Sequence, residues 1–269
     1  MDLPGELIKQ SSGVLTKAYD DLVHPSAEPA GAVLSLIPRT IRLWLKAWEK
    51  WVANGEEGLE KTAEALRGKV DSIPEERLRE PEPYIAIPAI QQIAYCFDSS
   101  ELREMYANLL ATSMDSATSE YVHPSFVEII RQLTPDEARL LRELPRSVTE
   151  YEPLGDYVLE LSSRGTMQTL LTNVSSFGRD VVQHLDRIPE YLENLIRLRI
   201  IESRPDVIIR DDSFYQDFPT DDEILDKAGV TLKDGLKLHL MCKSFNVTNY
   251  GLSFIRCCVD DFASRADEG

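Results

Sequence analysis

Apolar residues recur at helical spacing along much of the chain, and this pattern predicts a mainly helical protein. The clearest amphipathic segment is residues 39–52, which is apolar on one side and basic on the other. Weaker helical patterns cover Leu3–Leu22 and Glu56–Val70. Prolines interrupt the pattern over Pro74–Pro88, which therefore predicts an extended stretch. The apolar positions of residues 39–52 are Ile41, Trp44, Trp48 and Trp51.

Capping sequences mark the starts of three helices in the middle of the chain. A side chain that accepts a hydrogen bond at the N-cap, followed three residues later by glutamate, is typical of a helix start. Proline at the first helical position strengthens such a start. The three pairs are Asp98 with Glu101, Ser125 with Glu128, and Thr134 with Glu137, where Pro135 follows Thr134 directly.

The last part of the chain mixes helical and strand patterns. A short alternating run at Tyr157–Leu161 is followed by two segments of helical spacing, Met167–Phe177 and Pro189–Arg199. Two strand patterns come next, and Thr248 caps a final helix; the strands are Ile200–Arg210, interrupted at Pro205, and Leu236–Val247. Together with the helix that begins at Pro135, this order of elements is that of a winged helix. The predicted fold class is mainly α, with an N-terminal helical domain followed by a C-terminal winged-helix-like α+β module.

These patterns divide the chain into three predicted parts. Residues 1–72 hold the N-terminal helices, residues 73–133 form a helical core, and residues 134–269 form the winged-helix-like module. Within that module, residues 211–235 carry eight acidic residues and two lysines. We expect this stretch to be a solvated acidic insertion.

The acidity of the chain changes which partners we expect. Its formal net charge is −17, whereas nucleic-acid binding draws much of its affinity from a positively charged surface. Residues 211–235 join the two predicted wing strands, where their charge would repel a duplex. Nucleic acid is therefore a disfavoured partner, and we expect the winged-helix-like module to dock a protein.

The sequence predicts a soluble, cytoplasmic protein. Met1–Gln10 lacks the apolar run of a signal peptide, and the most apolar region, Ala30–Val52, carries five charged residues. The four cysteines show no metal-binding or redox spacing. We expect Cys257 and Cys258 to be buried in the final helix as free thiols.

No catalytic, metal or cofactor motif is recognisable. The chain lacks a nucleophile elbow, a phosphate-binding glycine loop and a zinc-protease motif. His123, Pro124 and Ser125 together invite a nucleophile interpretation, but proline and serine at this position favour a plain helix start. The spacing of acidic residues in 211–235 does not match a calcium-binding loop. We predict a protein that is not an enzyme and has no cofactor.

The tryptophan-rich segment departs from the acidic character of the chain. All three tryptophans fall within residues 39–52, which carry four basic residues and one acidic residue. An aromatic face opposite a basic face is typical of a helix at an anionic membrane surface. A core-packing helix and an oligomer seam remain alternatives. The residues that would contact lipid or a partner are Trp44, Trp48, Trp51, Arg42, Lys46 and Lys50.

Several short signatures occur in a fixed order in residues 73–144: Ile73–Glu76, Glu80–Pro81, Ile85–Pro88, Glu101–Leu110, Val122–Val127 and Leu133–Ala138. This ordered set resembles the Abi-alpha family, a bacterial domain associated with abortive infection, and the resemblance implies a phage or host protein as the docking partner. The resemblance also includes Tyr19–Leu22 with Pro25, and in the last third Tyr191–Leu195 and Thr248–Ile255. Residues 39–52 and 211–235 are not part of it. The motif residues expected to be structural are His123, Pro124, Phe126, Pro135 and Glu137.

The resemblance implies antiviral defence, in which an infected cell stops growing or dies before phage matures. It supplies no catalytic residues. Protein docking and engagement of the inner membrane surface by residues 39–52 are both open mechanisms. A winged-helix transcriptional regulator, or an adaptor without direct toxicity, is the alternative function.

Overall fold

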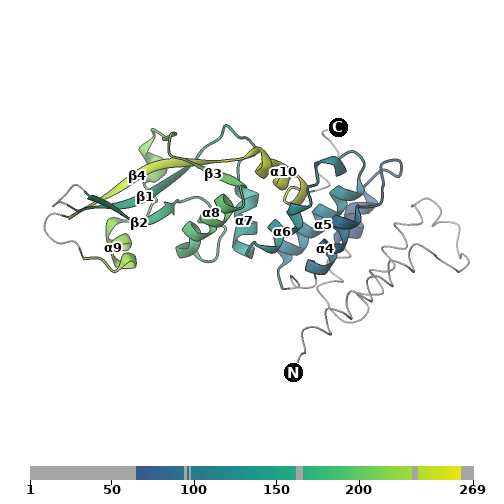
Figure 1. The fold of residues 1–269 in the computed structure, drawn as a ribbon, viewed down its shortest axis with the longest axis horizontal. Helices are drawn as coiled ribbons and strands as arrows, with labels where there is room; N and C mark the ends of the chain where they lie inside the picture. Colours follow the sequence, from purple (N-terminus) through teal and green to yellow (C-terminus); the bar gives the residue numbers. More distant parts are fainter. Residues whose placement is uncertain (1–64, 94–95, 97, 162–165, 232–235, 262–269) are drawn as a thin grey trace, which may run out of the picture. The chain divides into compact units, whose positions relative to one another are not determined.

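The computed structural model describes residues 65–93, 96, 98–161, 166–231 and 236–261 (Figure 1). These residues belong to two compact units, one formed by residues 1–127 with 261–269 and the other by residues 128–260. The predicted helices at Leu3–Leu22 and residues 39–52 lie outside the described residues. The end of the predicted helix Glu56–Val70 is described, and residues 65–71 are helical. The predicted boundaries after residues 72 and 133 stay a prediction.

The first unit is built around one buried helix. Its described elements are α4 (Pro83–Ile93), α5 (Ser100–Met114), the short 3-10 helix η1 (Ser119–Tyr121) and the start of α6 (Ser125–Arg131). Every residue of α5 from Met105 to Met114 is buried. Its buried hydroxyl groups bond back into the helix, since Thr112 donates to the carbonyl of Asn108 at 2.8 Å. The N-cap is Ser99, one residue after the predicted Asp98; its hydroxyl accepts a hydrogen bond from the backbone N–H of Leu102 at 3.2 Å.

Helix α4 corrects the prediction of an extended stretch over Pro74–Pro88. Pro83 is its first residue, where a proline costs no helical hydrogen bond, and Pro88 lies inside it. Four small or aliphatic side chains of α4 are buried: Ile85, Ala86, Ala89 and Ile93. Burial of this apolar face outweighs the hydrogen bond that Pro88 cannot donate. The proline count alone therefore misled the prediction, because burial of this apolar face depends on the rest of the unit.

The segment before α4 is held to the end of α5 by a buried carboxylate. Asp115 is 1% exposed and accepts from Arg77 through both of its oxygens, with Nε at 2.9 Å from Oδ1. The backbone supports the same contact, because Arg79 N–H donates to the Met114 carbonyl at 2.8 Å and Ser116 N–H donates to the Arg77 carbonyl at 2.8 Å. Two segments of the first unit, 38 residues apart in the chain, are joined in this way.

The second unit contains a four-stranded antiparallel sheet in the order β2-β1-β4-β3 (Figure 1). The strands are β1 (Glu152–Leu161), β2 (Thr166–Val174), β3 (Ile201–Arg204) and β4 (Leu236–Val247). The α-helices are α7 (Pro135–Glu143), α8 (Ile188–Arg197), α9 (Asp221–Ala228) and α10 (Asn249–Cys258), with 3-10 turns η2 (Leu185–Arg187) and η3 (Asp212–Tyr215). The described chain is therefore mixed α+β. The α+β character predicted for the C-terminal part is confirmed, whereas the mainly α class predicted for the whole chain is corrected.

The predicted helix over Met167–Phe177 is wrong, because this segment forms strand β2. Leu171 and Val174 lie three residues apart and still pack on one apolar cluster. They can do so because Asn173 adopts a left-handed conformation with φ of 56° and the β1–β2 register shifts near Tyr157. An irregular strand thus mimics helical spacing. With β2 in place of a helix, the element order is not the winged-helix order that the sequence predicted.

Other parts of the second unit agree with the sequence. Strand β4 has the predicted bounds, α8 matches the helix expected at Pro189–Arg199, and β3 covers the first half of Ile200–Arg210. Thr248 caps α10, since its hydroxyl accepts from the backbone N–H of Gly251 at 2.8 Å. Cys257 and Cys258 are buried in α10, as predicted.

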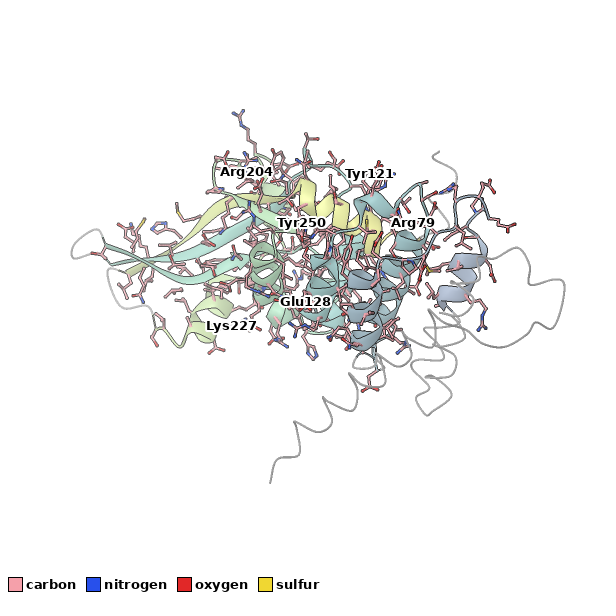
Figure 2. All side chains as sticks on the ribbon, turned by 45° about the vertical axis from the view of Figure 1, so that its right-hand side comes forward. Arg79, Tyr121, Glu128, Arg204, Lys227 and Tyr250 are labelled. Carbon is pink, nitrogen blue, oxygen red and sulfur yellow. The ribbon has the colours of Figure 1, made fainter. Side chains whose placement is uncertain are left out.

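The acidic segment 211–235 is not simply a solvated insertion, since its described residues fold onto the sheet. Phe218 and Ile224 pack with Tyr157 and Val174 in an apolar cluster. Figure 2 labels Lys227 on α9, and its amine donates to the backbone carbonyl of Asp186 at 2.7 Å. The acidic side chains of α9 are exposed while its apolar side chains are buried. Helix α9 is thus an amphipathic helix within the acidic stretch, which is why part of this stretch packs on the sheet while its acidic side chains stay exposed.

Candidate functional site

The motif around His123 begins helix α6. The Nδ1 atom of His123 accepts a hydrogen bond from the backbone N–H of Ser125 at 3.2 Å and lies 2.5 Å from the Ser125 hydroxyl. Phe126 is 1% exposed, and its ring centroid lies 6.0 Å from that of His123. Pro124 is exposed between them. A serine nucleophile and its base would use the same two atoms, but here both groups belong to a single helix start.

Pro135 and Glu137 lie in the first turn of α7. The Thr134 hydroxyl accepts from the Glu137 N–H at 3.3 Å, and Glu137 Oε2 accepts from the Thr134 N–H at 2.6 Å. This reciprocal capping box, with proline in the first turn, is the predicted one. Glu137 is 2% exposed, and its other oxygen accepts from the side-chain amide of Asn194 at 2.6 Å. The capping residue of α7 is therefore also a contact to α8.

Asp136 collects more hydrogen bonds than its neighbours in the motif. Its Oδ1 accepts from the backbone N–H of Gln183 at 2.9 Å and from the guanidinium of Arg139. Its Oδ2 accepts from the Tyr191 hydroxyl at 2.9 Å and from the backbone N–H of His184 at 3.2 Å. Asp136 is 4% exposed, so these donors replace the water that its charge requires.

The hydrogen bonds decide the charge state of Asp136. Burial alone would raise its pKa, but the donors from Gln183, Arg139, Tyr191 and His184 lower the pKa to about 2. Burial and the bond to Asp136 together raise the pKa of Tyr191 to about 12. Asp136 is therefore an anion at neutral pH, and Tyr191 keeps its proton. Such a pair fixes two helices rather than exchanging a proton at neutral pH.

Two sequence motifs far apart in the chain meet at this cluster. The segment Tyr191–Leu195 supplies Tyr191 to Asp136 and Asn194 to Glu137. Asn194 also donates to the backbone carbonyl of Gln132 at 3.1 Å, just before α7 begins. The motif Thr134–Glu137 and the motif in α8 are thus one hydrogen-bonded unit. We call Asp136, Glu137, Tyr191 and Asn194 the α7–α8 cluster.

Sequence reasoning did not single out Asp136. It lies between Pro135 and Glu137, which the capping pattern had already explained. Its partners Gln183, His184 and Tyr191 are between 47 and 55 residues away. No local spacing connects residues at that distance, so only the acidic first turn of α7 hinted at a role.

A second polar cluster lies across the sheet. The Lys243 amine on β4 contacts Asp156 Oδ1 on β1 at 2.8 Å and donates to the side-chain oxygen of Asn173 on β2 at 2.9 Å. Further along, His239 Nε2 lies 2.9 Å from Glu160 Oε2. These contacts pair strands in the β2-β1-β4 order, and the Lys243 amine faces the opposite charge of Asp156. Their arrangement accounts for polar residues on this sheet face without a ligand.

Other predicted site residues lie outside the described residues: Trp44, Trp48, Trp51, Arg42, Lys46 and Lys50. Within the described ranges, no three or more His, Cys, Asp or Glu side chains are grouped so that they could hold a metal ion. The helices of those ranges include none that is both long and apolar enough to cross a membrane.

Comparison with known proteins identifies the family. The family model described as abortive infection alpha matches residues 54–258 of the 269-residue chain. No curated protein and no solved structure matches the chain. The matched range holds both motifs of the α7–α8 cluster and runs through residues 211–235, whereas Tyr19–Leu22 and residues 39–52 precede it. Because the match covers well over half of the chain, the protein belongs to the abortive infection alpha family.

Proposed function

We propose that this protein acts in bacterial anti-phage defence by abortive infection, without catalysis, by docking a phage or host protein. The observation that carries the proposal is the family match over residues 54–258. It extends over both described units, so the proposed role belongs to the folded chain rather than to one short motif.

The contacts of the motif residues support a role without catalysis. His123 contacts the serine two residues ahead, Glu137 caps its own helix, and Asp136 is surrounded by four donors. Catalytic acids and bases need a pKa near the working pH and a path to substrate. The Asp136 carboxyl, with its pKa of about 2 and 4% exposure, meets neither requirement.

The charge of the second unit supports a protein partner over nucleic acid. Helix α9 begins with Asp221, Asp222 and Glu223, all of them exposed. Because Ile224 and Leu225 anchor this helix by burial, the acidic turn is held at a defined place. Phosphate groups would be repelled there, whereas a protein can present basic or neutral side chains.

Membrane engagement remains a second mechanism because of the sequence of residues 39–52. That segment combines three tryptophans with a net positive charge in a chain of net charge −17. Flotation with vesicles of phosphatidylglycerol and phosphatidylethanolamine tests it. Wild-type protein that floats, and a variant with Arg42, Lys46 and Lys50 all changed to glutamine that does not, would favour this mechanism. Wild-type protein that stays at the bottom of the gradient removes it.

The defence role is tested by phage challenge of cells that express the full chain, at low and high multiplicity. We expect the culture to survive at low multiplicity and to collapse at high multiplicity, because abortive infection sacrifices the infected cells. Cells with an empty plasmid are the control. Absence of protection against a broad phage panel, with the protein present at normal abundance, would contradict the proposal.

The docking mechanism is tested by affinity purification from infected and uninfected cells. A stoichiometric protein partner recovered only after infection would favour docking of a phage component. A DNA-binding assay at low salt serves as the companion measurement, because a transcriptional regulator would shift DNA there. If the protein clearly shifts DNA in this assay and no protein partner is recovered, transcriptional regulation would replace protein docking as the proposed mechanism.

A further inference from the structure

Helix α4 is apolar on the side that it exposes as well as on the side that it buries. Its eleven residues include no charged side chain. Opposite the buried residues, Tyr84, Ile87, Pro88 and Gln91 recur at helical spacing, with Tyr84 59% exposed and Ile87 36% exposed. We call these four residues the outer face of α4. A helix that is apolar all round is normally buried all round, so this face calls for a covering segment.

Acidic residues flank α4 at both ends. Glu80 and Glu82 precede the helix and Asp98 follows it. Glu80 and Asp98 are exposed, and the side chain of Glu82 is 47% exposed. Residues 65–127 carry ten acidic and five basic residues, which is a net charge of −5. A segment that covers the outer face should therefore combine an apolar stripe with basic residues.

Residues 39–52 of the same chain have both properties. Their apolar stripe is Ile41, Trp44, Trp48 and Trp51, and their net charge is +3 in a chain of net charge −17. As a helix, this stripe would be about 15 Å long, against about 10 Å for the outer face of α4. The two faces thus match in length and polarity, and the segment and the unit that carries α4 are opposite in charge.

The connection along the chain favours this segment over a separate partner. Only twelve residues, 53–64, separate it from the helix at residues 65–71, where Leu66 and Val70 are buried in the unit that carries α4. Twelve residues reach up to about 40 Å, which is more than the width of a compact unit of this size. A short tether gives an effective concentration on the order of millimolar. At micromolar protein the tethered segment therefore occupies the face before a second copy does.

We propose that residues 39–52 pack as a helix on the outer face of α4, with the tryptophans against Tyr84 and Ile87. Their basic residues then lie toward the acidic surroundings of α4. Engagement of a membrane by the same tryptophan face would require its release from α4. The packing does not depend on the defence role.

Tryptophan fluorescence of the full chain tests the packing, because all three tryptophans lie in residues 39–52. Acrylamide should quench the wild-type protein less than the urea-unfolded protein. Tyr84→Lys and Ile87→Lys should each raise the quenching constant about twofold or more, since each places a second positive charge against the tryptophan face. Met241→Lys, at a 50% exposed position of β4, is the matched control and should leave quenching unchanged. Circular dichroism of each variant checks that folding is intact.

Three results would overturn the proposal. Protection that grows with protein concentration would mean that a second copy covers the tryptophans. Tryptophans that are accessible in the free protein and protected only on vesicles with phosphatidylglycerol would assign the face to the membrane. Protection that neither α4 variant changes would place the rings on another surface. Phage protection is measured separately, so each of these results leaves the defence role standing.

Discussion

The hydroxyl of Tyr191 donates a hydrogen bond of 2.9 Å to Oδ2 of Asp136, across 55 residues of sequence. The bond joins the start of α7 to α8, and both groups are almost fully buried. Since Asp136 also accepts two backbone N–H groups, one carboxylate fixes the turn before α8 and the helix itself. The α7–α8 cluster therefore sets how two family motifs meet.

Loss of the tyrosine hydroxyl should destabilise the second unit. We expect Tyr191→Phe to lower the free energy of unfolding by about 1.5–3 kcal/mol, because a hydrogen bond to a charged group is lost inside the protein. Asp136→Ala should cost more, about 3–5 kcal/mol, since Arg139 and the backbone donors lose their anion. Urea unfolding of the full chain measures both. Tyr84→Phe is the control, because Tyr84 is 59% exposed and should change little.

The stability contributed by Asp136 should depend on pH in the acid range. Burial opposes the charged form, but hydrogen bonds lower the pKa from its ordinary 3.8 to about 2. A lowered pKa stabilises the fold above pH 3.8, and that stability is lost as the pH falls toward about 2. The difference in unfolding free energy between wild type and Asp136→Asn should stay constant from about pH 7 to about pH 5. It should shrink between about pH 4 and about pH 2, and an unchanged difference there would contradict this origin.

Gly251 should not tolerate a side chain. A Cβ at this position of α10 would overlap the backbone carbonyl of Ile200, which also accepts the Thr248 N–H at 3.0 Å. We expect Gly251→Ala to destabilise by about 1–3 kcal/mol. Gly68→Ala is the matched control: residue 68 is exposed and helical, with no atom near the new Cβ. That change should stabilise by about 0.5–1 kcal/mol, and equal effects at both sites would contradict the close contact.

The sequence predicted the elements whose signals are local. The capping box of Thr134 and Glu137, the Thr248 cap and the whole of β4 follow from residues within a few positions of one another. Strand β2 was missed because the left-handed Asn173 brings Leu171 and Val174 to one side, as a helix would. Helix α4 was missed because burial of its apolar face, which depends on the rest of the unit, outweighs Pro88.

The candidate site shows the same limit. Pro135 and Glu137 were recognisable from their places in a helix start, and both lie in the α7–α8 cluster or beside it. Asp136 was not recognisable from the sequence, because its partners Gln183 and Tyr191 are brought to it only by the fold of the intervening sheet hairpin. Spacing along the chain carries no information on such a contact. The hydrogen bonds of Asp136 can therefore be recognised only in the folded structure.

The ion pair of Arg77 and Asp115 should matter more than an exposed pair of the same chemistry. Arg77→Met leaves the Asp115 carboxylate, 1% exposed, without its cation, and we expect a loss of about 2–4 kcal/mol. Arg131→Met removes the exposed pair with Glu128, where both side chains are about half exposed, and should cost less than about 1 kcal/mol. Thermal unfolding of both variants gives the comparison. Equal losses would mean that burial of Asp115 is not the deciding factor.

The hydroxyl of Ser125 distinguishes a helix start from a catalytic site. If Ser125 were a nucleophile activated by His123, Ser125→Ala would abolish phage protection while leaving the protein folded and abundant. We expect the opposite: Ser125→Ala should keep protection at low multiplicity, because the 2.5 Å contact of the two side chains is local to the first turn of α6. His123→Ala should lower stability by about 0.5–2 kcal/mol, the range for losing a side-chain acceptor at a helix start, and should also keep protection. Immunoblots of each variant must show wild-type abundance, because a variant that is degraded would lose protection even if its side chain had no catalytic role. A full-length, folded Ser125→Ala protein without protection would therefore refute the non-enzymatic mechanism, whereas retained protection in both variants would leave His123 and Ser125 as parts of a helix cap.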